Sequence, residues 1–96
     1  MNDNNTPSIA DINSNRLAAV SVLFCNANGL EVTDELVIVL GNSIIYGVAT
    51  WYAQNGKKFS PATELIEEDA IRFALEKAQE VVLAAEAEVL ASVLGK

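Results

Sequence analysis

The sequence contains no histidine and only one cysteine, Cys25. Without histidine the chain has no imidazole for a catalytic triad, for acid-base catalysis near neutral pH or for metal ligation. A single cysteine excludes an intrachain disulfide and a thiolate zinc site. Because Cys25 follows Leu23 and Phe24 in an apolar stretch, we expect a buried, unreactive thiol. These absences exclude most kinds of catalytic and metal site.

Glycine and basic residues are also few. The five glycines are isolated, and none precedes a Lys-Ser or Lys-Thr pair, so the chain has no phosphate-binding glycine loop. Six basic against thirteen acidic residues give a net charge of -7, which disfavours binding to nucleic acid and to anionic lipid. The N-terminal segment has no Lys or Arg before an apolar run, which argues against a signal peptide and leaves a cytoplasmic location as the default. We expect no catalytic residue and no cofactor, and therefore no enzyme.

Apolar residues, in contrast, are abundant. They make up 51% of the 96 residues, whereas a domain of this size buries only about 60 to 65% of the surface that its unfolded chain exposes. Apolar surface is therefore expected to remain outside the core of one chain. Such surface usually contacts another subunit, a partner protein or lipid.

The chain is predicted to be a single all-α domain, a bundle of three main helices that forms oligomers. Residues 1–8 are polar and are expected to form a flexible tail, and residues 9–96 form the domain. Ser8 is a candidate cap for a helix over Ile9 to Ala27, which Asn28-Gly29 would end. Thr33 is a candidate cap for a second helix over Asp34 to Asn55.

The second segment has a competing interpretation. Its β-branched residues and its glycines at 41 and 47 are also compatible with strands, with residues 48–53 and 57–59 forming a hairpin. The helix is preferred because caps fit at both ends.

Ser60-Pro61 is the favoured start for a third helix that runs to Leu94. Uninterrupted, this helix would be about 50 Å long, while the other two would cover only about 30 Å of it. Either it breaks near Glu67 to Asp69, leaving a short helix before a long one, or its end pairs with a second subunit. The predicted self-association stripe consists of Ala78, Val82, Ala85, Val89 and Val93.

Carboxylates cluster at Glu64, Glu67 and Glu68, where spacings of three and four could present oxygens to a divalent cation. A carboxylate-metal helical hydrolase is therefore one alternative function. The simpler interpretation, and the preferred one, is a solvated helix start, because the segment from Leu36 to Asn55 contributes no carboxylate.

The uncharged run from Leu36 to Gly56 is long enough to cross a bilayer, so a small membrane-spanning protein is a second alternative. Its polar residues dilute it, and the preferred interpretation is a central helix buried nearly all round. Small residues such as Ser43 and Gly47 would let a neighbouring helix approach closely.

Aromatic and basic residues gather at the end of the second helix and in the loop after it. Trp and Tyr beside Lys are residue types that anchor protein interfaces, although they also fill the ends of small cores. The candidate interface comprises Tyr46, Trp51, Tyr52, Lys57, Lys58 and Phe59. The sequence thus predicts a small regulatory or inhibitory protein that binds a protein partner, as yet unidentified, and self-associates.

Overall fold

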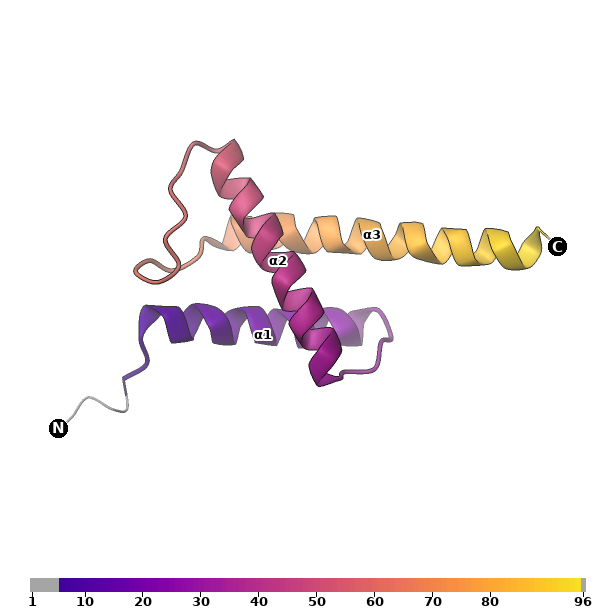
Figure 1. Cartoon of the computed structure of the whole chain (residues 1–96), viewed down its shortest axis with the longest axis horizontal. Helices are drawn as coiled ribbons and strands as arrows, with labels where there is room; N and C mark the ends of the chain where they lie inside the picture. Colours follow the sequence, from indigo (N-terminus) through magenta and orange to yellow (C-terminus); the bar gives the residue numbers. More distant parts are fainter. Residues whose placement is uncertain (1–5, 96) are drawn as a thin grey trace.

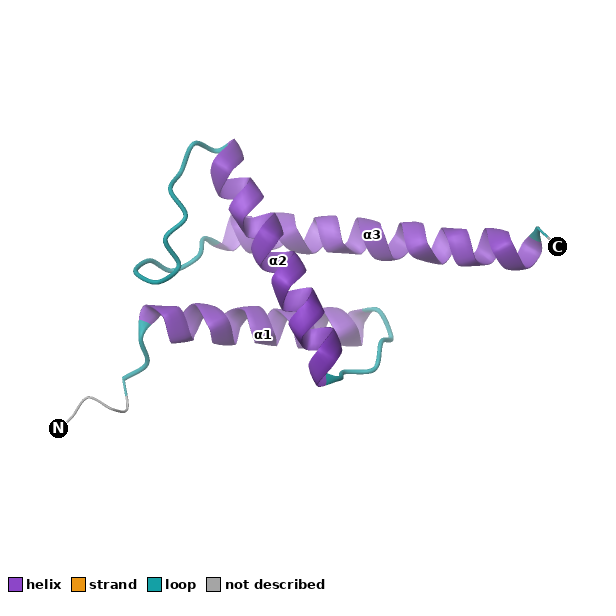
Figure 2. Cartoon of the chain, viewed as in Figure 1, coloured by secondary structure: helices purple, strands orange, loops and turns teal. Residues whose placement is uncertain are grey.

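The computed structural model describes residues 6–95, and within them the chain forms three α-helices and no strand (Figure 2). The helices are α1 (Ile9–Ala27), α2 (Asp34–Gln54) and α3 (Glu68–Leu94). The all-α prediction is confirmed, and the hairpin alternative over residues 48–59 is wrong. Of the predicted N-terminal tail, residues 1–5 lie outside the described part.

Capping residues set the bounds of the first two helices. The Ser8 hydroxyl accepts a hydrogen bond from the Asp11 N–H at 3.1 Å, and the Thr33 hydroxyl accepts one from the Leu36 N–H at 3.1 Å. After each helix a glycine takes the left-handed conformation, Gly29 with φ 68° and Gly56 with φ 65°. The bounds of α1 are as predicted, while α2 ends one residue earlier than expected, with Asn55 as its C-cap.

The predicted start of the third helix at Ser60-Pro61 is wrong, because α3 begins at Glu68. Residues 60–64 form a single turn, in which the Glu64 N–H donates to the Ser60 carbonyl at 2.9 Å. The break near Glu67 to Asp69 is therefore correctly placed, but a turn and an extended segment replace the short helix expected before it.

The physical cause of this difference is Asn13 of α1, which is 2% exposed. Its side-chain N–H groups donate to the carbonyls of Pro61 and Glu64 at 2.7 and 2.9 Å, and its oxygen accepts from the Ile66 N–H at 3.1 Å. The guanidinium of Arg16 donates to the Ile66 carbonyl at 2.8 Å. These hydrogen bonds pair backbone carbonyl and N–H groups of residues 61–66 that would be paired within the helix if α3 began at Ser60.

The three helices form two layers. In Figure 1, α1 and α3 run in the same direction and α2 crosses obliquely in front of both. The molecule measures 65 × 32 × 16 Å, and its long dimension comes from α3, whose C-terminal half extends past the other helices (Figure 1). A reciprocal pair of side-chain hydrogen bonds, at 2.8 and 3.1 Å, links Asn28, the C-cap of α1, to Gln79 of α3.

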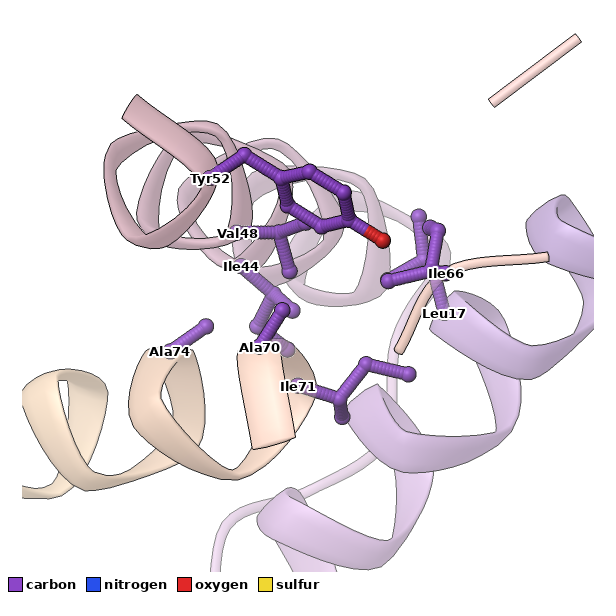
Figure 3. Packing of buried hydrophobic residues seen from close by; sticks show 8 residues of the cluster. All are labelled: Leu17, Ile44, Val48, Tyr52, Ile66, Ala70, Ile71 and Ala74. Atoms are coloured by element: carbon purple, nitrogen blue, oxygen red, sulfur yellow. The ribbon is translucent and has the colours of Figure 1, made fainter. Parts of the chain in front are cut away.

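The core lies where α2 crosses the start of α3 (Figure 3). It combines Leu17 of α1 and Ile66, in the loop before α3, with residues of α2 and α3. The full cluster comprises Leu17, Ile44, Val48, Tyr52, Ile66, Ala70, Ile71 and Ala74. Its small α3 residues let the two helices approach closely.

The expectation that α2 would be buried nearly all round is wrong for the single chain. Only Ile44, Val48 and Tyr52 of α2 are buried. Ile38, Val39 and Tyr46 are 62, 58 and 76% exposed, because α2 packs on the α1 and α3 layer through one face only. In the described part of the chain, α2 is the helix that is long and apolar enough to span a membrane, judged by length and composition.

Candidate interaction surface

The most exposed apolar surface lies on the C-terminal half of α3, residues 81–94, here called the arm. Every residue from 83 to 95 is exposed. Large apolar side chains are among them, and the exposed fractions are 56% for Leu83, 63% for Val89, 59% for Leu90, 64% for Val93 and 79% for Leu94. No other described element of the chain covers them.

The predicted self-association stripe follows the arm. Ala78 and Val82 at its start are half-buried against the body of the molecule, and Ala85, Val89 and Val93 are exposed. A hollow of about 570 Å³ separates Leu30, in the loop between α1 and α2, from Val82, Ala85 and Val89. The stripe therefore leaves the body beside an open apolar hollow, which none of the described residues 6–95 fills.

A second groove, also of about 570 Å³, lies between α2 and α3. Its floor is the contact of Gly47 with Ala74, and Tyr46, Phe73 and Val81 line its walls. The close approach predicted for Gly47 is thus present within one chain, and its neighbour is Ala74. Lys77 is the charged residue in this lining.

The candidate aromatic interface divides into buried and exposed residues. Tyr52 is 6% exposed and belongs to the core, where its ring lies 5.2 Å from that of Trp51 and 5.0 Å from that of Phe59, between centroids. Its hydroxyl accepts a hydrogen bond from the Glu67 N–H at 2.9 Å, at the start of α3. Tyr52 therefore organises the core and the beginning of α3.

Lys57 lines a surface hollow of about 660 Å³ beside Tyr52. The Lys57 ammonium lies 5.3 Å from the Trp51 ring centroid and donates to a Glu67 carboxylate oxygen at 2.8 Å. This hydrogen bond, more than any other interaction, holds the pKa of Lys57 above its ordinary value. Lys58 lines the same hollow, whereas Tyr46 lies a turn and a half away, on the α2–α3 groove.

The three carboxylates considered for metal binding lie in different surroundings. Glu67 is paired with Lys57, Glu64 lines the hollow beside Lys58, and Glu68 is the first residue of α3. Among the residues that the structure describes, no three Asp, Glu, Cys or His side chains are grouped as metal ligands would be.

The sequence did not reveal that Asn13 and Tyr52 hold the loop before α3. Both act on residues that are distant in the sequence, so local patterns carry no signal for them. Comparison with protein-family models, curated proteins and solved structures finds no match to this chain.

Proposed function

We propose that the protein is a small regulatory or inhibitory binding protein that acts as a homo-oligomer and catalyses no reaction. The observation that carries this proposal is the arm, which holds six large apolar residues more than half exposed. Exposing such a surface to water is unfavourable, at roughly 25 cal/mol per Å² of apolar area. A second copy of the chain is always present at the same concentration and offers an equally apolar surface.

The total surface supports the same proposal. A compact monomer of 10.3 kDa exposes about 5,350 Å², whereas this chain exposes 6621 Å². The difference exceeds the roughly 800 Å² that each partner buries in a standard interface. The radius of gyration is 16.2 Å, against about 12.5 Å for a compact domain of this length.

A protein partner would bind at the end of α2, where Trp51, Lys57 and Lys58 are accessible. Aromatic rings beside flexible cations are enriched at interfaces. The net charge of -7 favours a partner that is not itself strongly acidic. A cytoplasmic location is proposed with this function, since a soluble oligomer hides the apolar arm from water.

The test is the mass of the purified protein in solution, measured by size-exclusion chromatography with light scattering. We expect a mass that is a multiple of 10.3 kDa and that falls on dilution. A strictly monomeric protein at high concentration contradicts the proposal.

One observation favours a second candidate, a small membrane-spanning protein. The helix α2 is long and apolar enough to cross a bilayer, and most of its surface is exposed in the single chain. In that case the protein would sediment with membranes and need detergent for extraction. Recovery in a high-speed supernatant without detergent contradicts the membrane candidate and leaves the binding protein.

A further inference from the structure

We propose that two copies of the chain pair through α2, antiparallel and around a two-fold axis. The contact is the outer face of α2, which is the side turned away from α1 and α3. The outer face comprises Ile38, Val39, Asn42, Ile45, Tyr46, Ala49 and Ala53. The inference rests on the proposed function, because it names a surface through which the copies associate. A two-fold contact uses the same surface on both copies and closes at a dimer.

The first support is that the outer face is free along the whole helix. α2 lies in front of the layer formed by α1 and α3, and Ile44, Val48 and Tyr52 point back into the core (Figures 1 and 3). On the outer face, Ile38 and Tyr46 are 62 and 76% exposed. A second copy that approaches from this side meets α2 first, and each α1–α3 layer stays behind its own α2. The pairing therefore needs no movement of the described helices.

The second support is the spacing of residues on this face. Val39, Asn42, Tyr46, Ala49 and Ala53 recur at spacings of three and four, by which one helix packs along another at a small crossing angle. With the two-fold axis at the level of residue 44, Val39 lies opposite Ala49 of the second copy. Asn42 lies opposite Tyr46 of the second copy. Each layer then combines a larger with a smaller side chain, so the helices keep a constant separation.

The third support is the distribution of charge. Residues 36–56 contain no charged side chain, so the contact buries no like charges. Asp34 and Glu35 lie in the first turn of α2, and Lys57 and Lys58 follow its C-terminal end. Antiparallel pairing keeps the two copies of Glu35 about 27 Å apart and sets each beside the end that the lysines follow. Parallel pairing would gather four carboxylates at one end and align two helix dipoles, both unfavourable.

The position of Asn42 favours a second copy over lipid as the occupant. It is exposed at the middle of the outer face. Acyl chains there would leave its amide without hydrogen-bond partners, which is unfavourable. In the proposed pair the amide lies in a layer with Tyr46 of the second copy, whose hydroxyl is also polar. A single asparagine in such a layer also fixes the register of paired helices.

The proposed contact leaves the arm uncovered. The arm extends past α2 within the layer of α1 and α3 (Figure 1). The outer face of α2 and the arm are therefore separate surfaces, and substitutions on one test it independently of the other.

Site-specific disulfides test the direction and register. Cys25 is fully buried, so the parent chain contributes no accessible thiol and serves as the control. We would prepare Val39→Cys and Ala49→Cys separately, mix them, dissociate and reassociate them by dilution and concentration, and oxidise. The register sets residue 39 opposite residue 49, within the roughly 7 Å between Cα atoms that a disulfide tolerates. In either variant alone the two thiols would be about 15 Å apart along the axis.

We expect a covalent dimer that contains one copy of each variant, identified by its intact mass, and little dimer from either variant alone. Glu35→Cys mixed with Ala53→Cys provides a second pair, near the ends of the contact. Ala53→Cys alone should form no dimer, because its two thiols would be about 27 Å apart. Adding Val89→Gln, on the arm, should leave both disulfides unchanged.

A charge on the outer face tests the contact without a crosslink. Val39→Glu should weaken this pairing roughly 100-fold or more, because each dimer loses two buried valines and gains two carboxylates in an apolar contact. Leu23→Glu on α1 is the matched control, since Leu23 is 64% exposed against 58% for Val39 and lies outside the outer face. It should leave the dissociation constant unchanged. Circular dichroism checks that both variants remain helical.

The alternative outcomes separate this inference from the proposed function. Efficient disulfides in each single variant, including Ala53→Cys, would show parallel pairing and overturn the direction. A protein that is oligomeric by light scattering but forms no disulfide in either mixture would overturn the α2 contact and leave the proposed function standing. A monomeric parent would overturn both. A monomeric parent that also floats with vesicles of neutral phosphatidylcholine would show that lipid covers the outer face.

Discussion

Gly47 of α2 lies directly on Ala74 of α3: a Cβ atom at residue 47 would stand 2.8 Å from the Ala74 Cβ and 3.0 Å from its Cα. Both distances are shorter than carbon atoms tolerate, and the neighbour is partly backbone, which cannot rotate away. The absence of a side chain at residue 47 therefore sets the separation of the two helices at the centre of the core.

Replacing Gly47 by alanine should lower the stability. Alanine favours a helix interior by about 1 kcal/mol, but forcing α2 away from α3 costs about 1 to 3 kcal/mol and loosens the core. We expect net destabilisation of up to about 2 kcal/mol, measured by urea denaturation at one fixed protein concentration.

Gly41→Ala is the matched control in the same helix. A Cβ there would meet only the Ser21 hydroxyl oxygen, at 4.0 Å. This variant should gain about 0.5 to 1 kcal/mol from helix propensity. If both variants gain stability alike, the two helices do not cross at residue 47.

Asn13→Ala should destabilise the protein more than any exposed polar substitution on α1. It removes three hydrogen bonds to the segment from Pro61 to Ile66 and leaves two carbonyls and an N–H without these partners. With a net contribution near 1 kcal/mol for each bond, we expect a loss of about 2 to 4 kcal/mol. Asn15→Ala, at an exposed position of the same helix, should change the stability little. Equal effects of the two substitutions would contradict this role for Asn13.

The Lys57–Glu67 pair predicts a pKa change that can be measured directly. Glu67→Gln should lower the pKa of Lys57, because the hydrogen bond to Glu67 is the largest cause of its rise. Asp69→Asn, which removes the smallest of the contributions that raise this pKa, should lower it much less. NMR titration of the Lys57 side chain measures both, and equal decreases would contradict the assignment.

The sign of the linked stability follows from the direction of this shift. Because the folded-state pKa is raised, the contribution of the pair is fully present below the ordinary lysine pKa and is lost as the pH rises through the folded value. The pair should therefore cause no change in stability between pH 6 and pH 9, because this whole interval lies below the ordinary lysine pKa of 10.5.

The sequence was sufficient to predict the helix ends that depend on hydrogen bonds between residues close in the sequence. The hydroxyls of Ser8 and Thr33 accept hydrogen bonds from N–H groups three residues later. Gly29 and Gly56 adopt the left-handed conformation that follows a helix end. The start of α3 could not be predicted in this way. It depends on Asn13, which is about 50 residues distant in the sequence. Ser60-Pro61 has the local sequence pattern of a helix start, but hydrogen bonds from Asn13 hold this segment in a single turn instead.

Which apolar side chains stay exposed also depends on contacts between residues distant in the sequence. The apolar stripe from Ala78 to Val93 could be recognised from its spacing, but whether the chain covers it depends on where α1 and α2 end in space. Tyr52 and Tyr46 are the same residue type on one helix, yet they are 6 and 76% exposed. Only the direction of the crossing at Gly47 determines which of them faces the core.

Val89→Gln should weaken self-association strongly if the copies meet through the self-association stripe, because each dimer then loses two buried valines. At about 1.5 kcal/mol for each buried valine, the loss is about 3 kcal/mol, or roughly 100-fold in the dissociation constant. Leu83→Gln is the matched control: Leu83 is 56% exposed against 63% for Val89, but it lies about 120° around the helix axis from Val89, outside the self-association stripe. Sedimentation of a dilution series measures both constants, and circular dichroism confirms that α3 remains helical. If Leu83→Gln weakens association as much as Val89→Gln, the self-association stripe is not the contact face. If neither substitution weakens it, the copies associate through another surface.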